Sequence, residues 1–240
     1  MQLGVATMAG KLYGIGVGPG DPGLLTLRAK EVLDACGVIA FPVKKPGEGS
    51  VALDIIKPNV DISEKSIEEF LFSMDPDDSV RERCRAENMD KMCRLLDNGE
   101  DIAMVTLGDV GVYSTYMYID RDIRARGYET EVIPGIPSFC HGAALAGVPL
   151  MIGNEGLAVV PVAKENSKLL EEAVDNFDNI VVMKAFKSIG MLCDMLESKG
   201  IPLDRATVVS NVGMEGEYVG PMVRDREYGY FTTVIIKKKG

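Results

Sequence analysis

Residues 11–37 read KLYGIGVGPGDPGLLTLRAKEVLDACG, and this stretch decides the fold. A short apolar run over 11–17 ends in a glycine-rich loop, and apolar side chains then recur at helical spacing from Leu25 to Cys36, where Gly37 ends the pattern. The order strand, glycine loop, helix is typical of a parallel α/β sheet. Loops that follow the strands of such sheets commonly bind ligands, so residues 14–23 are a candidate ligand loop.

The same alternation continues through the first half of the chain. It predicts strands at 38–41, 69–73, 102–107 and 130–133, and helices at 51–57, 79–98 and 114–126, the second of these beginning with a capping box at Ser79–Glu82. The strands are apolar without interruption, which favours a parallel sheet covered by helices on both faces. Pro134, Gly135 and Pro137 then interrupt the chain. We therefore predict an N-terminal α/β domain over 9–132 and a C-terminal α/β domain over 133–240.

The second half has strand patterns at 157–162, 180–183 and 206–209, with helical patterns at 168–176 and 189–198. The segments 217–219 and 231–236 are strand-like, with no helical pattern between them. They predict an antiparallel pair and therefore a mixed second sheet. The expected fold class is α/β, with a parallel N-terminal sheet and a mixed C-terminal sheet.

Composition excludes several functions. The 240 residues include 26 Lys and Arg against 36 Asp and Glu, a formal net charge of -10, which disfavours nucleic acids and anionic membranes as partners. There is neither an apolar run long enough to span a bilayer nor a basic leader, so we expect a cytoplasmic protein. Five cysteines without a Cys-x-x-Cys pair, and a single histidine, His141, predict no disulfide framework and no metal site.

The glycine loop also matches a dinucleotide fingerprint, Gly18-x-Gly20-x-x-Gly23. Pro19 and Pro22 weaken this interpretation, because each removes an N–H group from a loop that would have to hydrogen-bond a pyrophosphate. A nucleotide-binding oxidoreductase stays an alternative at this point, as does a tight turn without a ligand.

Four segments together resemble the tetrapyrrole methyltransferase family. They are 17–27 (VGPGDPGLLTL), 106–110 (TLGDV), 132–138 (VIPGIPS) and 181–184 (VVMK). The resemblance implies two α/β domains with S-adenosylmethionine bound in the cleft between them, a tetrapyrrole substrate and a homodimer. Two positions depart from the family pattern: Val110 stands where the family usually has proline, and Pro137 where it has threonine.

Within the family, residues 12–22, 112–118 (VYSTYMY) and 138–150 are most similar to methylases that act at carbon 20 of precorrin-2 or its cobalt complex, in cobalamin biosynthesis. The resemblance to the anaerobic branch favours the cobalt-bound substrate. Phe41–Val43 stands where relatives that form siroheme carry an aspartate, which argues against that branch. A tetrapyrrole methylase that acts at another position and diphthine synthase have the same fold and stay alternatives, as does a ligand-binding protein without catalysis.

The resemblance implies a set of cofactor-binding residues: Pro19, Gly108, Asp109, Val110, Tyr113, Ser138, Met183 and Val212, the last through its backbone. Glycine at 108 would allow close backbone approach. Asp109 is also a candidate catalytic residue that would contact the cationic end of the cofactor, or it is a turn-forming aspartate at a strand end.

Lys184 is the predicted catalytic contact to the macrocycle, because it follows a strand whose carboxyl end should face ligands. The substrate class carries several carboxylates, so Lys44, Lys45 and Lys187 would join it in a positive rim, unless they are ordinary solvated lysines. Tyr230 is a third catalytic candidate, either through its phenol or, alternatively, as aromatic packing at a sheet edge. His141 is expected to be a helix histidine rather than a cobalt ligand.

Overall fold

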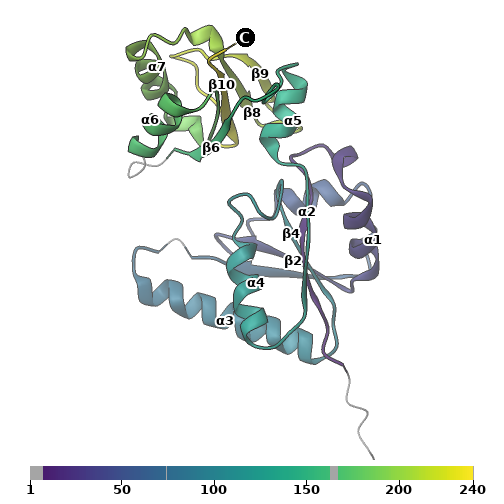
Figure 1. The fold of residues 1–240 in the computed structure, drawn as a ribbon. Helices are drawn as coiled ribbons and strands as arrows, with labels where there is room; N and C mark the ends of the chain where they lie inside the picture. The colour runs from purple at the N-terminus through teal and green to yellow at the C-terminus, as the bar shows by residue number, and fades with distance from the viewer. Residues whose placement is uncertain (1–7, 74, 163–166, 240) are drawn as a thin grey trace, which may run out of the picture. The chain divides into compact units, whose positions relative to one another are not determined.

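The computed structural model describes residues 8–73, 75–162 and 167–239. The chain divides into two compact units between Pro137 and Ser138 (Figure 1). We call them the N-terminal unit and the C-terminal unit. The division follows Pro137 because Gly135 is still held by the first unit, through a hydrogen bond from its N–H to Asp109.

The N-terminal unit contains a parallel five-stranded sheet. Its strands are β1 (Leu12–Gly16), β2 (Val38–Val43), β3 (Ser66–Leu71), β4 (Ile102–Thr106) and β5 (Thr130–Ile133), in the order β3-β2-β4-β1-β5. All four neighbouring pairs are parallel. This confirms the predicted parallel sheet. Because β1 lies between β4 and β5, the loops that follow these three strands emerge side by side.

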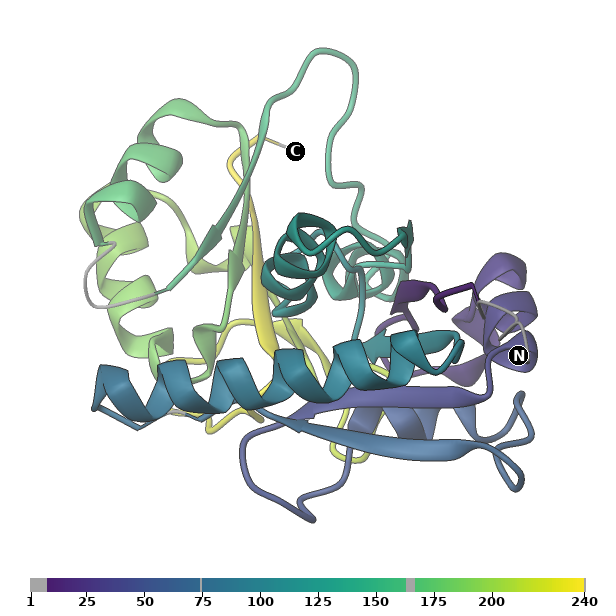
Figure 2. The same ribbon diagram turned by 90° about the horizontal axis from the view of Figure 1, so that it is seen from below.

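Helices cover both faces of this sheet, as its continuous apolar strands predict. The helices are α1 (Leu27–Ala35), α2 (Val51–Ile56), α3 (Asp78–Asp97) and α4 (Tyr116–Ala125), with a 3-10 turn, η1, at Pro22–Leu24. Helices α1 and α2 pack with Ile15 and Ile39 in one buried cluster, and α3 and α4 pack with Leu12 and Met104 in another. The two pairs lie on opposite sides of the strands in Figure 1, and Figure 2 shows α3 along its length.

Among the predicted boundaries in this unit that differ from the structure, two have a clear physical reason. Strand β3 begins at Ser66, because the Ser66 N–H donates to the Gly37 carbonyl and starts the pairing with β2 earlier than 69. Helix α3 begins at Asp78, and its N-cap is Asp77, whose carboxylate accepts the Ser79 N–H at 2.8 Å. Ser79 is therefore inside the helix and not its cap, since the carboxylate already caps this end.

The C-terminal unit has a mixed sheet, as predicted. Its strands are β6 (Leu157–Pro161), β7 (Asn179–Met183), β8 (Ala206–Ser210), β9 (Tyr218–Pro221) and β10 (Thr232–Lys237), in the order β6-β7-β10-β8-β9. Only β6 and β7 are parallel. Helices α6 (Ser167–Asn176) and α7 (Ile189–Ser198) cover one face, and α5 (Ser138–Leu145) packs on β8 and β10 from the other; short 3-10 turns are η3 (Ala185–Lys187) and η4 (Leu203–Arg205).

The predicted pairing of the last two strands is wrong, because β8 lies between β9 and β10. Residues Val234–Ile236 are buried on both faces of the sheet, so β10 needs neighbours on both sides. Strand β9 contains Gly220 and ends at Pro221, which suits an edge.

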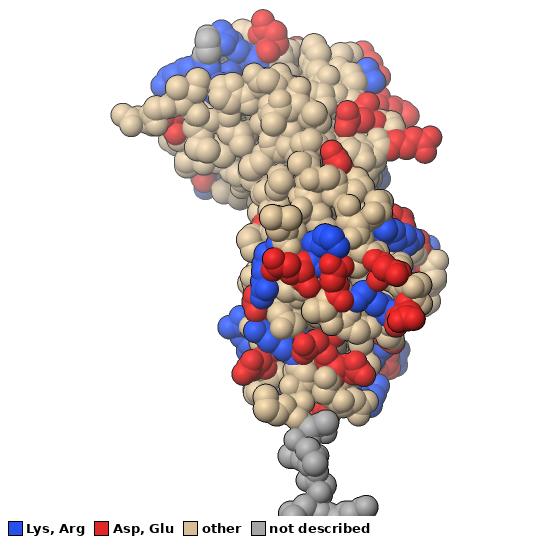
Figure 3. Space-filling model, turned by 90° about the vertical axis from the view of Figure 1, so that its right-hand side faces the viewer, with Lys and Arg blue, Asp and Glu red and all other residues tan. Residues whose placement is uncertain are grey.

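The surface offers no dominant basic stripe on the face shown in Figure 3, where acidic and basic side chains of the N-terminal unit are interleaved. Arg28, for example, pairs with both Glu31 and Glu131. Over the three described stretches of the chain, helices long and apolar enough to cross a membrane are absent. The same residues contain no group of three His, Cys, Asp or Glu side chains able to hold a metal ion.

Candidate active site

The loops after β1, β4 and β5 are joined backbone to backbone. Gly18 and Gly108 exchange two hydrogen bonds, from the Gly18 N–H to the Gly108 carbonyl at 3.2 Å and from the Gly108 N–H to the Gly18 carbonyl at 2.7 Å. A Cβ atom added to Gly135 would lie 2.2 Å from the Gly108 carbonyl oxygen, and one added to Gly16 would lie 2.5 Å from the Gly135 nitrogen. Gly16, Gly108 and Gly135 therefore allow the three loops to touch each other. We call this contact the glycine junction.

Gly108 has a φ of 73°, in the left-handed region. The family resemblance predicts that Gly108 allows close approach of a ligand, but its left-handed backbone by itself already favours glycine. A side chain there would be strained whether or not a ligand is bound.

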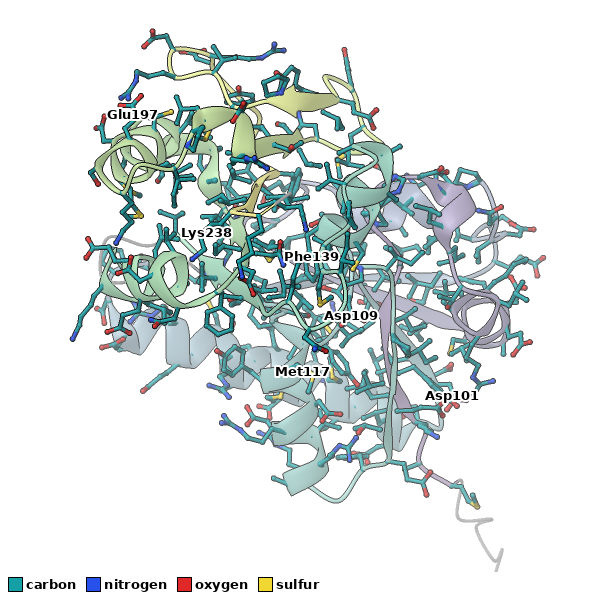
Figure 4. All side chains as sticks on the ribbon, turned by 45° about the horizontal axis from the view of Figure 1, so that its top comes forward. Asp101, Asp109, Met117, Phe139, Glu197 and Lys238 are labelled. Carbon is teal, nitrogen blue, oxygen red and sulfur yellow. The ribbon has the colours of Figure 1, made fainter. Side chains whose placement is uncertain are left out.

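Asp109 fastens two of these loops (Figure 4). One carboxylate oxygen accepts the Gly111 N–H at 2.8 Å, and the other accepts the Gly135 N–H at 2.9 Å. Both oxygens are therefore engaged by backbone amides of the N-terminal unit. This arrangement favours the turn-forming role weighed for Asp109 over direct contact with a cofactor.

The other predicted residues of the N-terminal unit differ in accessibility. Pro19 is buried, and the Val110 side chain is wholly buried in the core beside Tyr116, so a ligand could reach Val110 only through its backbone. Tyr113 is half exposed and has a φ of 51°. Partial burial raises the pKa of its phenol, which therefore stays protonated at neutral pH.

The glycine loop does not have the hydrogen bonding of a dinucleotide site. The Gly23 N–H donates to the Asp21 carboxylate at 2.7 Å, and the Leu24 N–H donates to the Asp21 carbonyl. Helix α1 begins only at Leu27, where the Thr26 hydroxyl caps it. The Gly23, Leu24 and Ala29 amides thus bond within the chain rather than being available to a pyrophosphate, which weakens the oxidoreductase interpretation.

In the C-terminal unit, the pairing of the strands brings four predicted residues to one sheet edge. Thr233 of β10 lies opposite Met183, and Thr232 lies opposite Ser210. The end of β7, the end of β8 and the start of β10 therefore meet. We call this end of the sheet, where β7 and β8 end and β10 begins, the β7 edge. It carries four predicted residues, in or next to these strands: Met183, Lys184, Val212 and Tyr230.

Ser138 lies toward the same edge. A Cβ atom on Gly142 of α5 would meet Val209 near the end of β8, whereas Leu145 and Ala146 line a cavity of about 360 Å³ with Ala206 at its beginning. Helix α5 therefore runs opposite to β8, and its first residue, Ser138, is near the end of β8. His141 is half-buried on this helix.

Three non-glycine residues among those described have positive φ, namely Tyr113 (51°), Lys184 (59°) and Asn211 (49°). Each follows a strand of the sheets, β4, β7 and β8 respectively. Left-handed backbone costs an ordinary residue about 1–2 kcal/mol and is concentrated at functional sites. Sequence patterns cannot show φ. In the structure, positive φ marks Tyr113 and Lys184, both of which the sequence analysis predicts as site residues.

The lysines of the predicted rim fall into two groups. Lys44 and Lys45 are exposed after β2, in a loop whose N–H groups donate to the Glu48 carboxylate at 3.2 Å. In the C-terminal unit, Lys184 precedes η3 as its N-cap and Lys187 is the last residue of η3. Sequence reasoning missed Phe186 and Phe231, which pack around Tyr230 at the β7 edge. The only sequence signal for these two residues is their position, since Phe186 is two residues after Lys184 and Phe231 directly follows Tyr230.

Comparison with known proteins identifies relatives of the whole chain. Residues 11–224 match the family of tetrapyrrole (corrin/porphyrin) methylases. The chain is 41% identical over 174 residues, 72% of each protein, to a probable cobalt-precorrin-2 C(20)-methyltransferase of Methanocaldococcus jannaschii. It is 28% identical to the cobalt-precorrin-2 C(20)-methyltransferase of Salmonella typhimurium, covering 97% of this chain and 98% of that protein.

It is also 28% identical to a precorrin-2 C(20)-methyltransferase of Sinorhizobium sp., over 95% of each chain. Among solved structures, a cobalt precorrin-4 methyltransferase superposes with a TM-score of 0.73 at 18% identity, over 95% of this chain and 94% of that one. This likeness confirms the predicted fold class.

Proposed function

Because this chain belongs to the tetrapyrrole (corrin/porphyrin) methylase family, we propose that it transfers the methyl group of S-adenosylmethionine to carbon 20 of cobalt-precorrin-2 or of metal-free precorrin-2. The 41% identity to a probable cobalt-precorrin-2 C(20)-methyltransferase carries this proposal. The cobalt-bound substrate is the first choice, since two of the three relatives described have it in their names. Two further predictions are a homodimer, from the family resemblance, and a cytoplasmic location, from the sequence pattern.

The residues present suit the proposed cofactor. The half-exposed Tyr113 ring offers an apolar face for a purine, and the Met183 side chain is partly accessible. When bound, S-adenosylmethionine would supply a methyl group on a positively charged sulfur, for in-line transfer to an electron-rich ring carbon with S-adenosylhomocysteine as the leaving product. The protein then has to hold two carbons in line and exclude water, and it needs no covalent intermediate. Loops fixed by the glycine junction are suited to such positioning.

Two measurements test the proposal. The purified protein, incubated without oxygen with S-adenosylmethionine and cobalt-precorrin-2, should yield a product heavier by one methyl group, and nuclear magnetic resonance should locate that group at carbon 20. Metal-free precorrin-2 is assayed beside it. Calorimetry should show binding of S-adenosylhomocysteine but not of NAD or NADP. Methylation at another ring position, or binding of NAD alone, would contradict the proposal.

Lys184→Met should weaken binding of the tetrapyrrole substrate and leave binding of the cofactor nearly unchanged. Loss of one charge-assisted contact to a carboxylate costs about 1.5–3 kcal/mol, so KM for the tetrapyrrole should rise about tenfold or more. Affinity for S-adenosylhomocysteine, measured by calorimetry, should stay within about threefold. Added salt should raise KM more in the wild type than in the variant.

The matched control is Lys168→Met on α6, where the side chain is exposed and pairs with Glu172. Lys168→Met should leave both the KM for the tetrapyrrole and the affinity for S-adenosylhomocysteine unchanged. Loss of cofactor affinity in Lys184→Met, with KM for the tetrapyrrole retained, would move Lys184 to the cofactor pocket.

A further inference from the structure

Three aromatic rings gather at the β7 edge. The Phe186 and Tyr230 ring centroids are 5.2 Å apart at an interplanar angle of 57°, and those of Tyr230 and Phe231 are 5.1 Å apart at 82°. Phe186 belongs to η3, whereas Tyr230 and Phe231 precede β10. Strand pairing therefore joins segments more than forty positions apart into one group, which we call the aromatic cluster.

The aromatic cluster remains accessible to solvent. Tyr230 is 55% exposed and Phe231 is 39% exposed. Such rings add little to the core, although their spacing is within the range of favourable aromatic pairs. A contiguous exposed group of aromatic side chains marks a surface that receives a ligand more often than isolated exposed rings do.

Positive charge accompanies the aromatic cluster. The Lys187 ammonium lies over the Phe186 ring, 5.3 Å from its centroid. Lys184, at the other end of η3, is exposed and held in a left-handed conformation. Glycine or asparagine would adopt this conformation at lower cost, so a lysine there indicates that its side chain is needed. Two lysines therefore border an aromatic surface in a protein of net charge -10.

We propose that the aromatic cluster and Lys187 form a binding surface for one face of the tetrapyrrole ring. The inference rests on the proposed function and deepens it by naming residues that recognise the substrate. A tetrapyrrole combines a broad π system with peripheral carboxylates, which suits aromatic rings bordered by ammonium groups. Tyr230 contributes its ring, and its phenol takes no part in proton transfer.

The anchoring of η3 keeps this surface in place. Ala185 is wholly buried, and the Ser188 N–H donates to the Ala185 carbonyl at 2.8 Å. The turn is therefore fixed by its buried first residue, while the two residues that follow are accessible, Phe186 in part and Lys187 more fully. Such preorganisation limits the entropy lost when a ligand binds.

The test compares Phe186→Leu, Tyr230→Leu and Tyr230→Phe with the wild type, using cobalt-precorrin-2 under anaerobic conditions. The two leucine variants should raise KM for cobalt-precorrin-2 at least tenfold. Tyr230→Phe should change KM and kcat by less than twofold, since the ring is kept. Affinity for S-adenosylhomocysteine should be unchanged in all three. Lys187→Gln should raise KM severalfold at low salt and have a smaller effect at high salt.

Phe177→Leu is the matched control. Phe177 is also 39% exposed in the C-terminal unit, but it precedes β7, at the opposite edge of the sheet. The KM of Phe177→Leu for cobalt-precorrin-2 should equal that of the wild type, and circular dichroism should show that all variants are folded.

If the wild type turns over cobalt-precorrin-2 and the leucine variants have the same KM as the wild type, the proposed aromatic surface is wrong, whereas the proposed function stands. A strong fall of kcat in Tyr230→Phe would return the phenol to catalysis and also contradict the inference. Absence of turnover in the wild type with cobalt-precorrin-2 and with precorrin-2 would reject the proposed function, and the inference with it.

Discussion

Gly135→Ala is expected to destabilise the N-terminal unit by about 3 kcal/mol, the upper end of the usual range for overpacking. The new Cβ atom would lie 2.2 Å from the Gly108 carbonyl oxygen and 2.6 Å from the Gly16 carbonyl carbon. Both neighbours are backbone atoms, so relief requires the loops to separate. The melting temperature should fall by about 6–12 °C, and affinity for S-adenosylhomocysteine should fall as well. Thermal denaturation followed by circular dichroism, with calorimetry, measures both.

Gly190→Ala on α7 is the control for that substitution. A Cβ atom there meets open space, and the residue is helical, so the variant should be unchanged or more stable by about 0.4–1 kcal/mol. Equal melting temperatures for Gly135→Ala and the wild type would show that the glycine junction tolerates a side chain.

Asp109→Ala should destabilise the protein by about 3 kcal/mol or more even without a ligand. The substitution removes the acceptor from the Gly111 and Gly135 N–H groups, and hydrogen bonds to a charged group contribute about 1.5–3 kcal/mol each. Asp109→Asn retains one acceptor oxygen and should lose about half as much. Urea denaturation of the ligand-free protein measures these differences.

Asp225→Ala is the comparison for a surface aspartate, and its stability should stay within about 0.5 kcal/mol of the wild type. If Asp109 acts chiefly by contacting the cofactor, Asp109→Ala will instead match the wild type in ligand-free stability and lose only affinity. The two roles are therefore separated by a measurement made without any cofactor.

Local patterns predicted the elements well where one strong signal was sufficient. The apolar run, glycine loop and helix of residues 11–37 are β1, the connecting loop and α1. Local patterns gave the wrong answer where the pairing of strands depends on contacts between distant parts of the chain. Strands β9 and β10 are consecutive in sequence, yet the burial of Val234 and its neighbours requires β8 between them. No local spacing encodes that preference.

The candidate site shows the same division. Family motifs selected Asp109, Gly108 and Lys184, but they could not show that Asp109 binds two amides or that Lys184 is left-handed. Phe186 and Phe231 have no motif of their own. Their meeting depends on the pairing of β7 with β10, which only the folded sheet reveals.

The central position of β10 has a consequence for biosynthesis. Strands β7 and β8 are translated before residues 232–237, yet each has β10 as a neighbour in the finished sheet. While the nascent chain is still attached to the ribosome, both strands present open edges, which can pair with other chains. The N-terminal unit contains all of its strands by residue 133 and can fold first. The interval between the two folding events is the period in which the growing polypeptide depends most on protection by chaperones.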